Sequence, residues 1–358
     1  MKKLLSLALV LAMVLTMSVT AFAADNTLDN ERKTGTTEVT HTVSDSYIVT
    51  IPDSMTIGTD ANVSVKDVVL ASDQELTVSV SSTQYNGGWK LKNGDDTIGY
   101  TLKIDNTDVA NNGTVLTVKS DETATKTLKT ELSGTAKYSG NYTDTLTFTV
   151  AVAYSYDGTG VTTEKDLNSM LNWLTARLNA GATDIVLNLS DNSDDLRFES
   201  DGESGPIDEI CVIREISDTI KQSDAVDGTI HLTVRSASAG SYSWSYSENT
   251  KLKTITLPDA TILAGACFNG CTNLTAVYAP SVTEIVGMPF GGCDNLTILE
   301  LTATGSFTFE KDGNTSWNSG TSNIDLKLNI DKQSDVVQNQ DGTGTWNGNT
   351  FNSITFVD

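Results

Sequence analysis

Leu252-Lys-Thr-Ile-Thr-Leu-Pro258 is repeated 22 residues further along the chain as Leu274-Thr-Ala-Val-Tyr-Ala-Pro280. The turn that follows is repeated as well, since Ala266-Cys-Phe-Asn-Gly-Cys-Thr-Asn273 returns as Met288-Pro-Phe-Gly-Gly-Cys-Asp-Asn295. A fixed period of about 20–30 residues is typical of a solenoid, in which each turn buries its apolar face against its neighbours. The repeat therefore predicts stacked strands in this part of the chain.

Apolar and cysteine residues hold the recurring positions, and we expect them to form the scaffold of the repeat. They are Leu252, Ile255, Phe268, Cys271, Leu274, Val277, Phe290, Cys293 and Leu296. Buried free thiols are favoured at the cysteine positions, although an exported chain also permits disulfides. The two histidines, His41 and His231, lie far from the cysteines in sequence, which argues against a zinc site.

The pattern L-x-x-I-x-L-P…F-x-x-C-x-x-L in 252–296 resembles the BspA-type leucine-rich repeat of bacterial surface and secreted proteins. The resemblance implies a stacked solenoid that serves as a protein-binding surface. It covers about a sixth of the chain, so its implication for the fold is stronger than its implication for function.

Short runs with apolar residues at every second position fill residues 36–155, for example Ser46-Tyr-Ile-Val-Thr-Ile51 and Leu76-Thr-Val-Ser-Val80. This alternation predicts half-buried strands, and their spacing predicts an antiparallel β-sandwich. The end of this region and the string Trp89-Lys90-Leu91 loosely resemble pilin-like, spore-coat-U and WxL-type surface domains. Trp89 is either a core residue of the sandwich or an exposed anchor for a ligand.

The alternation stops at Tyr156-Asp-Gly-Thr-Gly160, and we predict a linker at 156–162. Helical spacing follows, with Thr163 and Asp166 as a capping box and Gly181 as a stop signal. A second helix is predicted from Pro206. Residues 163–250 are therefore expected to cap a repeat module that occupies 251–358 and ends in degenerate turns. The predicted fold class is mainly β, with a β-sandwich domain followed by a capped leucine-rich-repeat, β-solenoid-like domain.

Residues 1–23 combine a basic start, an apolar run and Ala21-Phe-Ala23, the pattern of a secretory signal peptide. Residues 24–35 are predicted to be a flexible start of the exported chain. Removal of 1–23, which contains two lysines and no acid, takes the formal net charge from −23 to −25. This acidity argues against nucleic acid as a partner, and no membrane insertion is expected after cleavage. We expect a secreted protein, either free or associated with the cell surface.

The sequence contains no recognised catalytic constellation. Nucleophile elbows, zinc-peptidase helices, phosphate loops and dinucleotide fingerprints are all absent, so no catalytic residue, metal ligand or cofactor is predicted. The acidic loop 191–203 is either a solvated surface or a calcium loop. Leu196 stands where an EF-hand requires glycine, which weakens the calcium interpretation.

Tyr242-Ser-Trp-Ser-Tyr246 is the most aromatic short segment outside the repeat. On a strand its three aromatic rings would share one face, either exposed for binding or buried between cap and first repeat. Residues between the scaffold positions, such as Thr256, are the other candidates for ligand contact. The predicted ligand-binding residues are Tyr242, Trp244, Tyr246, Lys253, Thr275, Tyr278, Thr297 and Glu300.

Three functions are consistent with these observations. The first is an adhesin-like interaction protein that binds a protein ligand on host or neighbouring cells through the repeats. The second is a carbohydrate-binding protein that stacks a glycan on its exposed aromatic residues. The third is a structural subunit of a coat or fibre, assembled by strand addition through the sandwich.

Overall fold

The computed structural model describes residues 44–85, 88–191, 197–199, 209–310 and 323–357. The predictions for 1–23, 24–35, 36–43 (with His41), Pro206 and most of the acidic loop lie outside these residues. Strands account for 42% of the chain and helices for 12%, which confirms the predicted mainly-β class.

The first sheet lies entirely in the N-terminal part and has the strand order β1-β2-β8-β5-β4, with β6 paired to β5. Its strands are β1 Ser46–Thr50, β2 Ala61–Val69, β4 Trp89–Asn93, β5 Asp96–Ile104, β6 Thr107–Asp108 and β8 Ala124–Leu132. All of its strand pairs are antiparallel.

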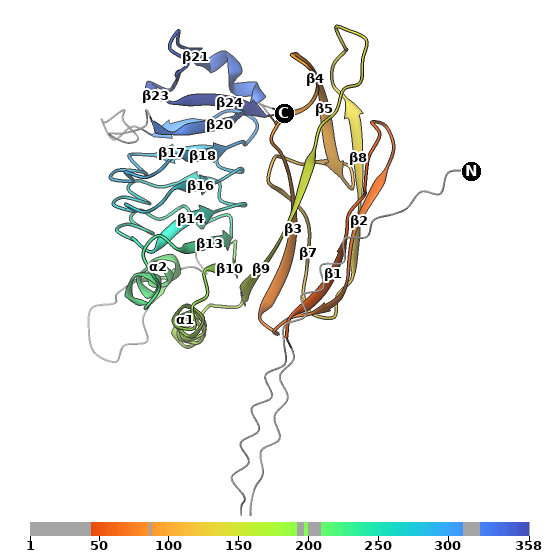
Figure 1. The fold of residues 1–358 in the computed structure, drawn as a ribbon. Coiled ribbons are helices and arrows are strands. Elements are labelled where there is room, and N and C mark those ends of the chain that lie inside the picture. Colours follow the sequence, from red (N-terminus) through yellow and green to blue (C-terminus); the bar gives the residue numbers. More distant parts are fainter. Residues whose placement is uncertain (1–43, 86–87, 192–196, 200–208, 311–322, 358) are drawn as a thin grey trace, which may run out of the picture.

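The second sheet runs through both parts of the molecule in the order β24-β20-β18-β16-β14-β13-β10-β9-β3-β7 (Figure 1). Its N-terminal strands are β3 Gln74–Ser82, β7 Gly113–Val118 and β9 Leu146–Gly158. The others are β10 Asp184–Leu189, β13 Ile230–Arg235, β14 Leu252–Thr256, β16 Ala276–Tyr278, β18 Ile298–Leu301, β20 Asp325–Asn329 and β24 Ser353–Val357. We call β10 to β24 of this sheet the parallel stack.

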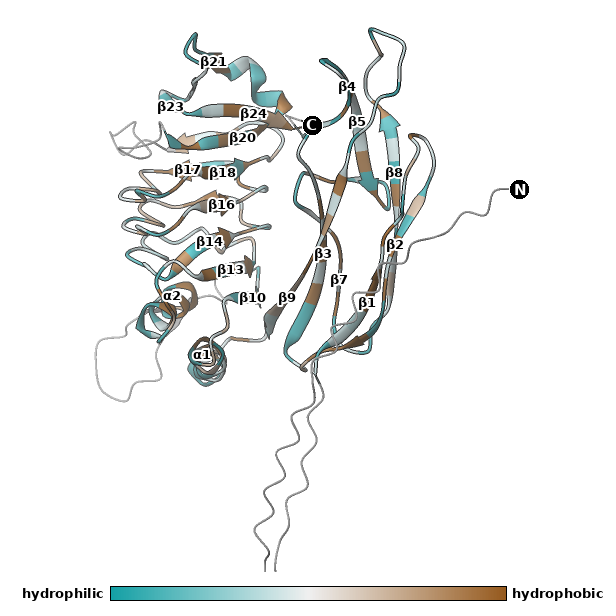
Figure 2. Ribbon diagram, viewed as in Figure 1, coloured by the Kyte–Doolittle hydropathy of each residue, from teal (hydrophilic) through white to brown (hydrophobic). Residues whose placement is uncertain are grey.

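One apolar core lies between the first sheet and strands β9, β3 and β7, and we call this unit the sandwich. Alternation along each strand supplies this core, since Leu76, Val78 and Val80 of β3 are fully buried while the residues between them are only partly covered. Figure 2 shows hydrophobic residues along the strands of both the sandwich and the parallel stack.

Strand β9 belongs to both units. Residues Leu146 to Tyr154 pair antiparallel with β3, and Tyr154 to Gly158 pair parallel with β10. Residues 156–158, which the sequence placed in a linker, are therefore the end of a strand. Gly158 looked like a breaker, but its α-carbon packs so closely that an added β-carbon would lie 2.8 Å from Cδ2 of Leu189.

Helix α1 (Glu164–Asn179) begins at the predicted capping box. The Thr163 hydroxyl accepts from the backbone N–H of Asp166 at 3.2 Å, and Leu167 and Leu174 lie on the buried face. Helix α2 (Val212–Gln222) begins later than the sequence predicted, because Glu209–Cys211 form strand β12, which pairs with β11 (Arg197–Glu199). Both helices cover the β10 end of the parallel stack (Figure 1).

The 22-residue repeat sets the register of the stack. Ile255 of β14 lies beside Val277 of β16, which lies beside Leu299 of β18, and all three are buried. The rings of Phe268 and Phe290 stack at 5.7 Å in the turns. All nine predicted scaffold positions are buried.

Smaller elements complete the described chain. A second parallel ladder joins β15 Ile262–Leu263, β17 Glu284–Val286 and β19 Thr308–Glu310. The far end holds a 3-10 helix, Ile330–Asp335, and a three-stranded antiparallel sheet of β21 Val336–Gln338, β22 Gly344–Trp346 and β23 Asn349–Phe351. Trp346 and Phe351 are buried there.

All four cysteines are buried and free. The Cys271 thiol donates to the carbonyl of Tyr246 at 2.9 Å, and the Cys293 thiol donates to the carbonyl of Phe268 at 3.0 Å. Each thiol therefore joins its own turn of the stack to the preceding one. The cysteines act as small buried residues with a weak donor, as the free-thiol interpretation expected.

Two acidic residues of the sandwich hold it to the stack beside β9. Glu75 is only 2% exposed and pairs with the guanidinium of Arg235 on β13 at 2.8 Å. Asp73 accepts from the indole N–H of Trp173 at 2.7 Å and pairs with Arg177 at 2.6 Å, both on α1. These contacts fix the sandwich against the first strands of the stack.

Arg235→Met should destabilise the chain by about 3–5 kcal/mol, because it leaves the buried Glu75 carboxylate without its partner. Urea denaturation followed by circular dichroism measures this loss. Lys103→Met is the matched control, since it removes the exposed pair with Glu131 and should cost less than about 1 kcal/mol. Equal losses in the two variants would contradict a buried clamp between β3 and β13.

Stability should fall above pH 9 because burial raises the pKa of the Cys271 thiol from 9.0 to about 12. The folded state keeps this proton while the unfolded state releases it, so its contribution is complete below pH 9 and is lost as the pH rises toward 12. Urea midpoints at a series of pH values test this. Cys271→Ala should show a shallower decline, by up to about 1.4 kcal/mol per pH unit, whereas Thr275→Ala should keep the original slope.

Candidate functional site

The segment 242–246 is not a strand, contrary to the sequence prediction. It forms consecutive turns, in which Tyr242 and Tyr246 are buried and Trp244 is exposed. The Tyr246 ring stacks on Phe268 at 5.3 Å, in line with the Phe268–Phe290 pair. Tyr246 is thus the counterpart of Phe268 in an earlier turn of the stack.

This earlier turn is hidden in the sequence, because its aromatic residues alternate with serine in the pattern of a strand. The signal was nevertheless present, since Tyr246 stands 22 residues before Phe268 and Asn249 stands 22 residues before Cys271. Asn249 is buried, and its side-chain amide donates to the carbonyl of Ser217 on α2 at 3.1 Å. Asn249, at the position that cysteine holds in the later turns, therefore joins this turn to helix α2.

Trp244 is the most exposed aromatic ring among the predicted binding residues, with 54% of its surface accessible. Its backbone has φ +63°, in the left-handed region that bulky side chains rarely adopt. Ala266, the equivalent residue of the next turn, also has a positive φ, of +56°. On one side the Arg214 guanidinium donates to the carbonyl of Ser243 at 3.0 Å, which places a cation next to this turn.

The outward face of the strands is turned toward the sandwich. Glu300 pairs with Lys327 at 2.9 Å, and the Lys327 ammonium lies 5.1 Å from the ring centroid of Tyr85, a sandwich residue. Tyr278, beside Glu300 in the register, is half-buried, and its pKa is raised by burial and then by the Glu300 charge. Of the predicted binding residues, Tyr278 and Glu300 therefore lie on the side that faces the sandwich.

Lys253, Thr275 and Thr297 occupy one repeat position at the start of successive strands. The Thr275 hydroxyl donates to the carbonyl of Lys253 at 3.0 Å, and the Thr297 hydroxyl donates to the carbonyl of Thr275 at 3.2 Å. These threonines hold the turns together, while Lys253 and Thr297 are also exposed. They do not lie on the face that carries Tyr278 and Glu300.

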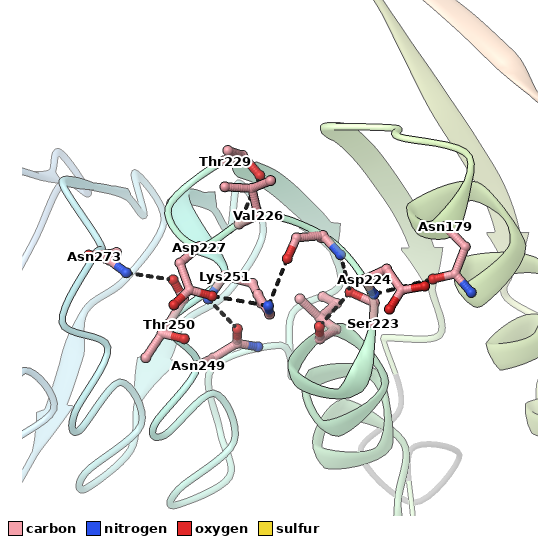
Figure 3. A network of polar contacts seen from close by, with 12 residues as sticks. Asn179, Ser223, Asp224, Val226, Asp227, Thr229, Asn249, Thr250, Lys251 and Asn273 are labelled. Atoms are coloured by element: carbon pink, nitrogen blue, oxygen red, sulfur yellow. Dashed lines mark hydrogen bonds and ion pairs between the residues drawn. The ribbon is translucent and has the colours of Figure 1, made fainter.

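A polar network closes the α2 end of the stack (Figure 3). The Lys251 ammonium donates to the carbonyl of Ala225 at 2.7 Å and pairs with Asp227 at 3.0 Å. The side-chain amide of Asn273 donates to the carbonyl of Thr250 at 2.9 Å. Each of these side chains contacts a backbone carbonyl or a side chain of the loop after α2. The network therefore stabilises this loop and has a structural role.

Trp89 is a core residue of the sandwich. It is buried, and its indole N–H donates to the carbonyl of Val109 at 2.8 Å. Of the two interpretations of Trp89, the exposed anchor is therefore wrong, and of the tryptophans named for binding only Trp244 is available at the surface.

Within the described ranges, no three His, Cys, Asp or Glu side chains are grouped so that they could hold a metal ion. Asp191, at the start of the acidic loop, accepts from the backbone N–H of Ala237 at 2.8 Å. The His231 ring lies 2.8 Å from the Thr254 hydroxyl on the neighbouring strand. Among the described residues, no helix is both long enough and apolar enough to cross a membrane.

No protein-family model, curated protein or solved structure matches the chain. Assignment of a function therefore depends on the geometry of its surface.

Trp244→Gly should leave the free energy of unfolding within about 1 kcal/mol of the original, because relief of the left-handed backbone offsets the lost packing of an exposed ring. Tyr246→Ala should cost about 3–5 kcal/mol, since it empties a buried aromatic position. Ala266→Gly is the control, because it relieves a positive φ without removing an aromatic ring. Urea denaturation compares the three, and a loss above about 3 kcal/mol for Trp244→Gly would make its ring part of the scaffold.

Proposed function

We propose that this protein is an exported interaction protein that binds a protein ligand on host or neighbouring cells. In this proposal 1–23 are a signal peptide and 36–155 form the sandwich domain. Residues 163–250 cap a leucine-rich-repeat solenoid in 251–358. The regular register of β14, β16 and β18 supports the solenoid assignment, because a 22-residue period joins equivalent residues of adjacent strands.

The exposed Trp244 ring is the observation that carries the proposal. Tryptophan is enriched in the energetic centres of protein interfaces because it buries a large area on binding. The positive φ of Trp244 recurs at Ala266 in the next turn, so the geometry of the repeat turn imposes this conformation. Since Tyr242 and Tyr246 are buried, they act by holding the turn that presents Trp244.

Charge favours a partner with a basic surface. The chain carries a formal net charge of −23, and oppositely charged partners associate faster with such a surface. Arg214 and Lys253 are local exceptions, so they would contact acidic or polar groups of the partner.

The test compares binding of Trp244→Gly and Ala266→Gly to extracts of mucus, extracellular matrix and cell envelopes. We expect the original chain and Ala266→Gly to retain one protein partner, and Trp244→Gly to bind it at least about tenfold more weakly. Protease treatment of the extract should abolish the binding, and periodate oxidation of glycans should not. Equal binding of both variants, or sensitivity to periodate alone, would overturn the proposal.

A structural role is the second candidate, and the free side of β9 favours it. Among the described strands, residues 146–153 of β9 pair only with β3, so the other edge has no strand beside it. The core-facing Phe148, Val150 and Val152 are only partly buried, unlike Val78 on β3. A long strand edge without charge or proline is a template for strand addition. An extended strand of another copy would complete this side of the sandwich.

Ala151→Lys places a charge on this edge and should abolish any concentration-dependent assembly of the chain. Thr117→Lys is the control, because β7 is the opposite edge of the same sheet and its register with β3 is irregular. Sedimentation velocity over a wide concentration range reports the assembly. A strict monomer at every concentration for the original chain would exclude the structural role.

A further inference from the structure

The turns that carry Trp244 expose a second large apolar side chain. Met288 stands two repeats of 22 residues after Trp244 and is 38% exposed, and Ala266 stands between them and is half-buried. We call Trp244, Ala266 and Met288 the turn row. An inference about this row rests on the proposed function, since it names the kind of partner that the same site binds.

The surface around the turn row has the composition of a protein interface. Residues 243–247, 265–269 and 287–291 contain no charged residue, although 19% of the chain is charged. Tryptophan, methionine and arginine are enriched at interfaces, whereas lysine, aspartate and glutamate are depleted. The exposed Arg214 lies at one end of the row, where its guanidinium donates to the carbonyl of Ser243. The row is therefore suited to a partner that covers it with apolar side chains.

The backbone of these turns is engaged within the stack. The N–H groups of Trp244, Tyr246 and Phe268 donate to carbonyls of the next turn, at 3.4, 2.8 and 2.8 Å. Strand addition needs unpaired backbone groups at an edge. These pairs favour a partner that docks through its side chains.

The spacing of the row selects the secondary structure of the partner. Ring centroids in successive turns are 5.3 Å apart for Tyr246 and Phe268 and 5.7 Å apart for Phe268 and Phe290, close to the helix pitch of about 5.4 Å. Trp244 and Met288 are thus about 10 Å apart along the stack, which matches residues i and i+7 of a helix. Residues i, i+4 and i+7 share one helix face, so a helix aligned with the stack places one side chain on each position.

Extended partners fit the row less well. On a strand, about 10 Å separates residues i and i+3, which point to opposite faces. In a polyproline II segment residues i and i+3 share a face at about 9 Å, but such segments bind in grooves lined by aromatic rings, and the row contains a single ring. The helix is the partner that contacts all three positions.

Charges beside the row favour a basic polar face on that helix. Glu248 and Asp294 are exposed at the ends of the first and third turns, and the chain has a formal net charge of −23. Lysine and arginine side chains on either side of an apolar helix face would be attracted to this surface.

We propose that the turn row binds a basic amphipathic α-helix of the partner protein. The helix lies along the stack, with apolar side chains on Trp244, Ala266 and Met288 and basic side chains toward the acidic residues at the ends of the turns.

The test uses two peptides of about 18 residues with the same leucine and lysine composition. One has leucine at helical spacing, and the other alternates leucine with lysine. Fluorescence anisotropy with the full chain should show that the helical peptide binds at least about tenfold more tightly, because only its leucines reach every position of the row. A proline-rich peptide of equal charge is the third probe, and tighter binding of this peptide would overturn the proposal.

Met288→Ser should weaken binding of the helical peptide roughly three- to tenfold, and Trp244→Gly about tenfold or more. Ile298→Ser is the matched control, because Ile298 is 40% exposed on β18, outside the turns, and should leave binding unchanged. The thermal midpoint of each variant verifies that it folds.

Equal binding of the two leucine–lysine peptides, or unchanged binding by Met288→Ser, overturns the helix. The proposed function survives that outcome if a protein from the extracts still depends on Trp244 for binding. It fails separately if Trp244→Gly retains that protein.

Discussion

The shared strand β9 is the constraint on which the architecture depends. Its first part is antiparallel to β3 and its last part is parallel to β10, so the sandwich and the parallel stack are pieces of one sheet. A strand cannot rotate about its own axis without breaking its ladder hydrogen bonds, and this fixes the direction in which the stack leaves the sandwich. The contacts of Asp73 and Glu75 with α1 and β13 lie beside the point where β9 changes partners, and they reinforce it.

The repeat could be predicted from sequence because its physical basis is local and periodic. Each turn of 22 residues must present a large apolar side chain where Phe268 and Phe290 stack and a small one where Cys271 and Cys293 lie. The same requirement explains the failure at 242–246. There the alternation of aromatic residues with serine has the period of a strand, but the longer period of the stack determines the structure and buries Tyr246.

The remaining errors share one cause, which is that a distant partner decides a local conformation. Gly158 was interpreted as a break, yet β10 pairs with it and Leu189 packs against it. The start of α2 was placed too early because pairing with β11 makes 209–211 a strand. Trp89 is a core residue because the distant Val109 carbonyl accepts its indole N–H, a contact that does not follow from the local sequence. Propensity and periodicity carry no information about contacts of this kind.

The division between scaffold and binding surface follows from the same contacts. Most residues between the repeat anchors, which the sequence offered as ligand contacts, are occupied: Thr275 and Thr297 bond to the preceding turn, and Glu300 is paired with Lys327. Among the residues that the sequence offered for binding, Trp244 and Lys253 are left, since the Trp244 ring is exposed and Lys253 is exposed on β14. The Trp244 ring departs from what folding alone would favour, because a large apolar ring stays accessible to water. Such departures persist when something other than stability selects them, and they are therefore the positions where function is to be sought.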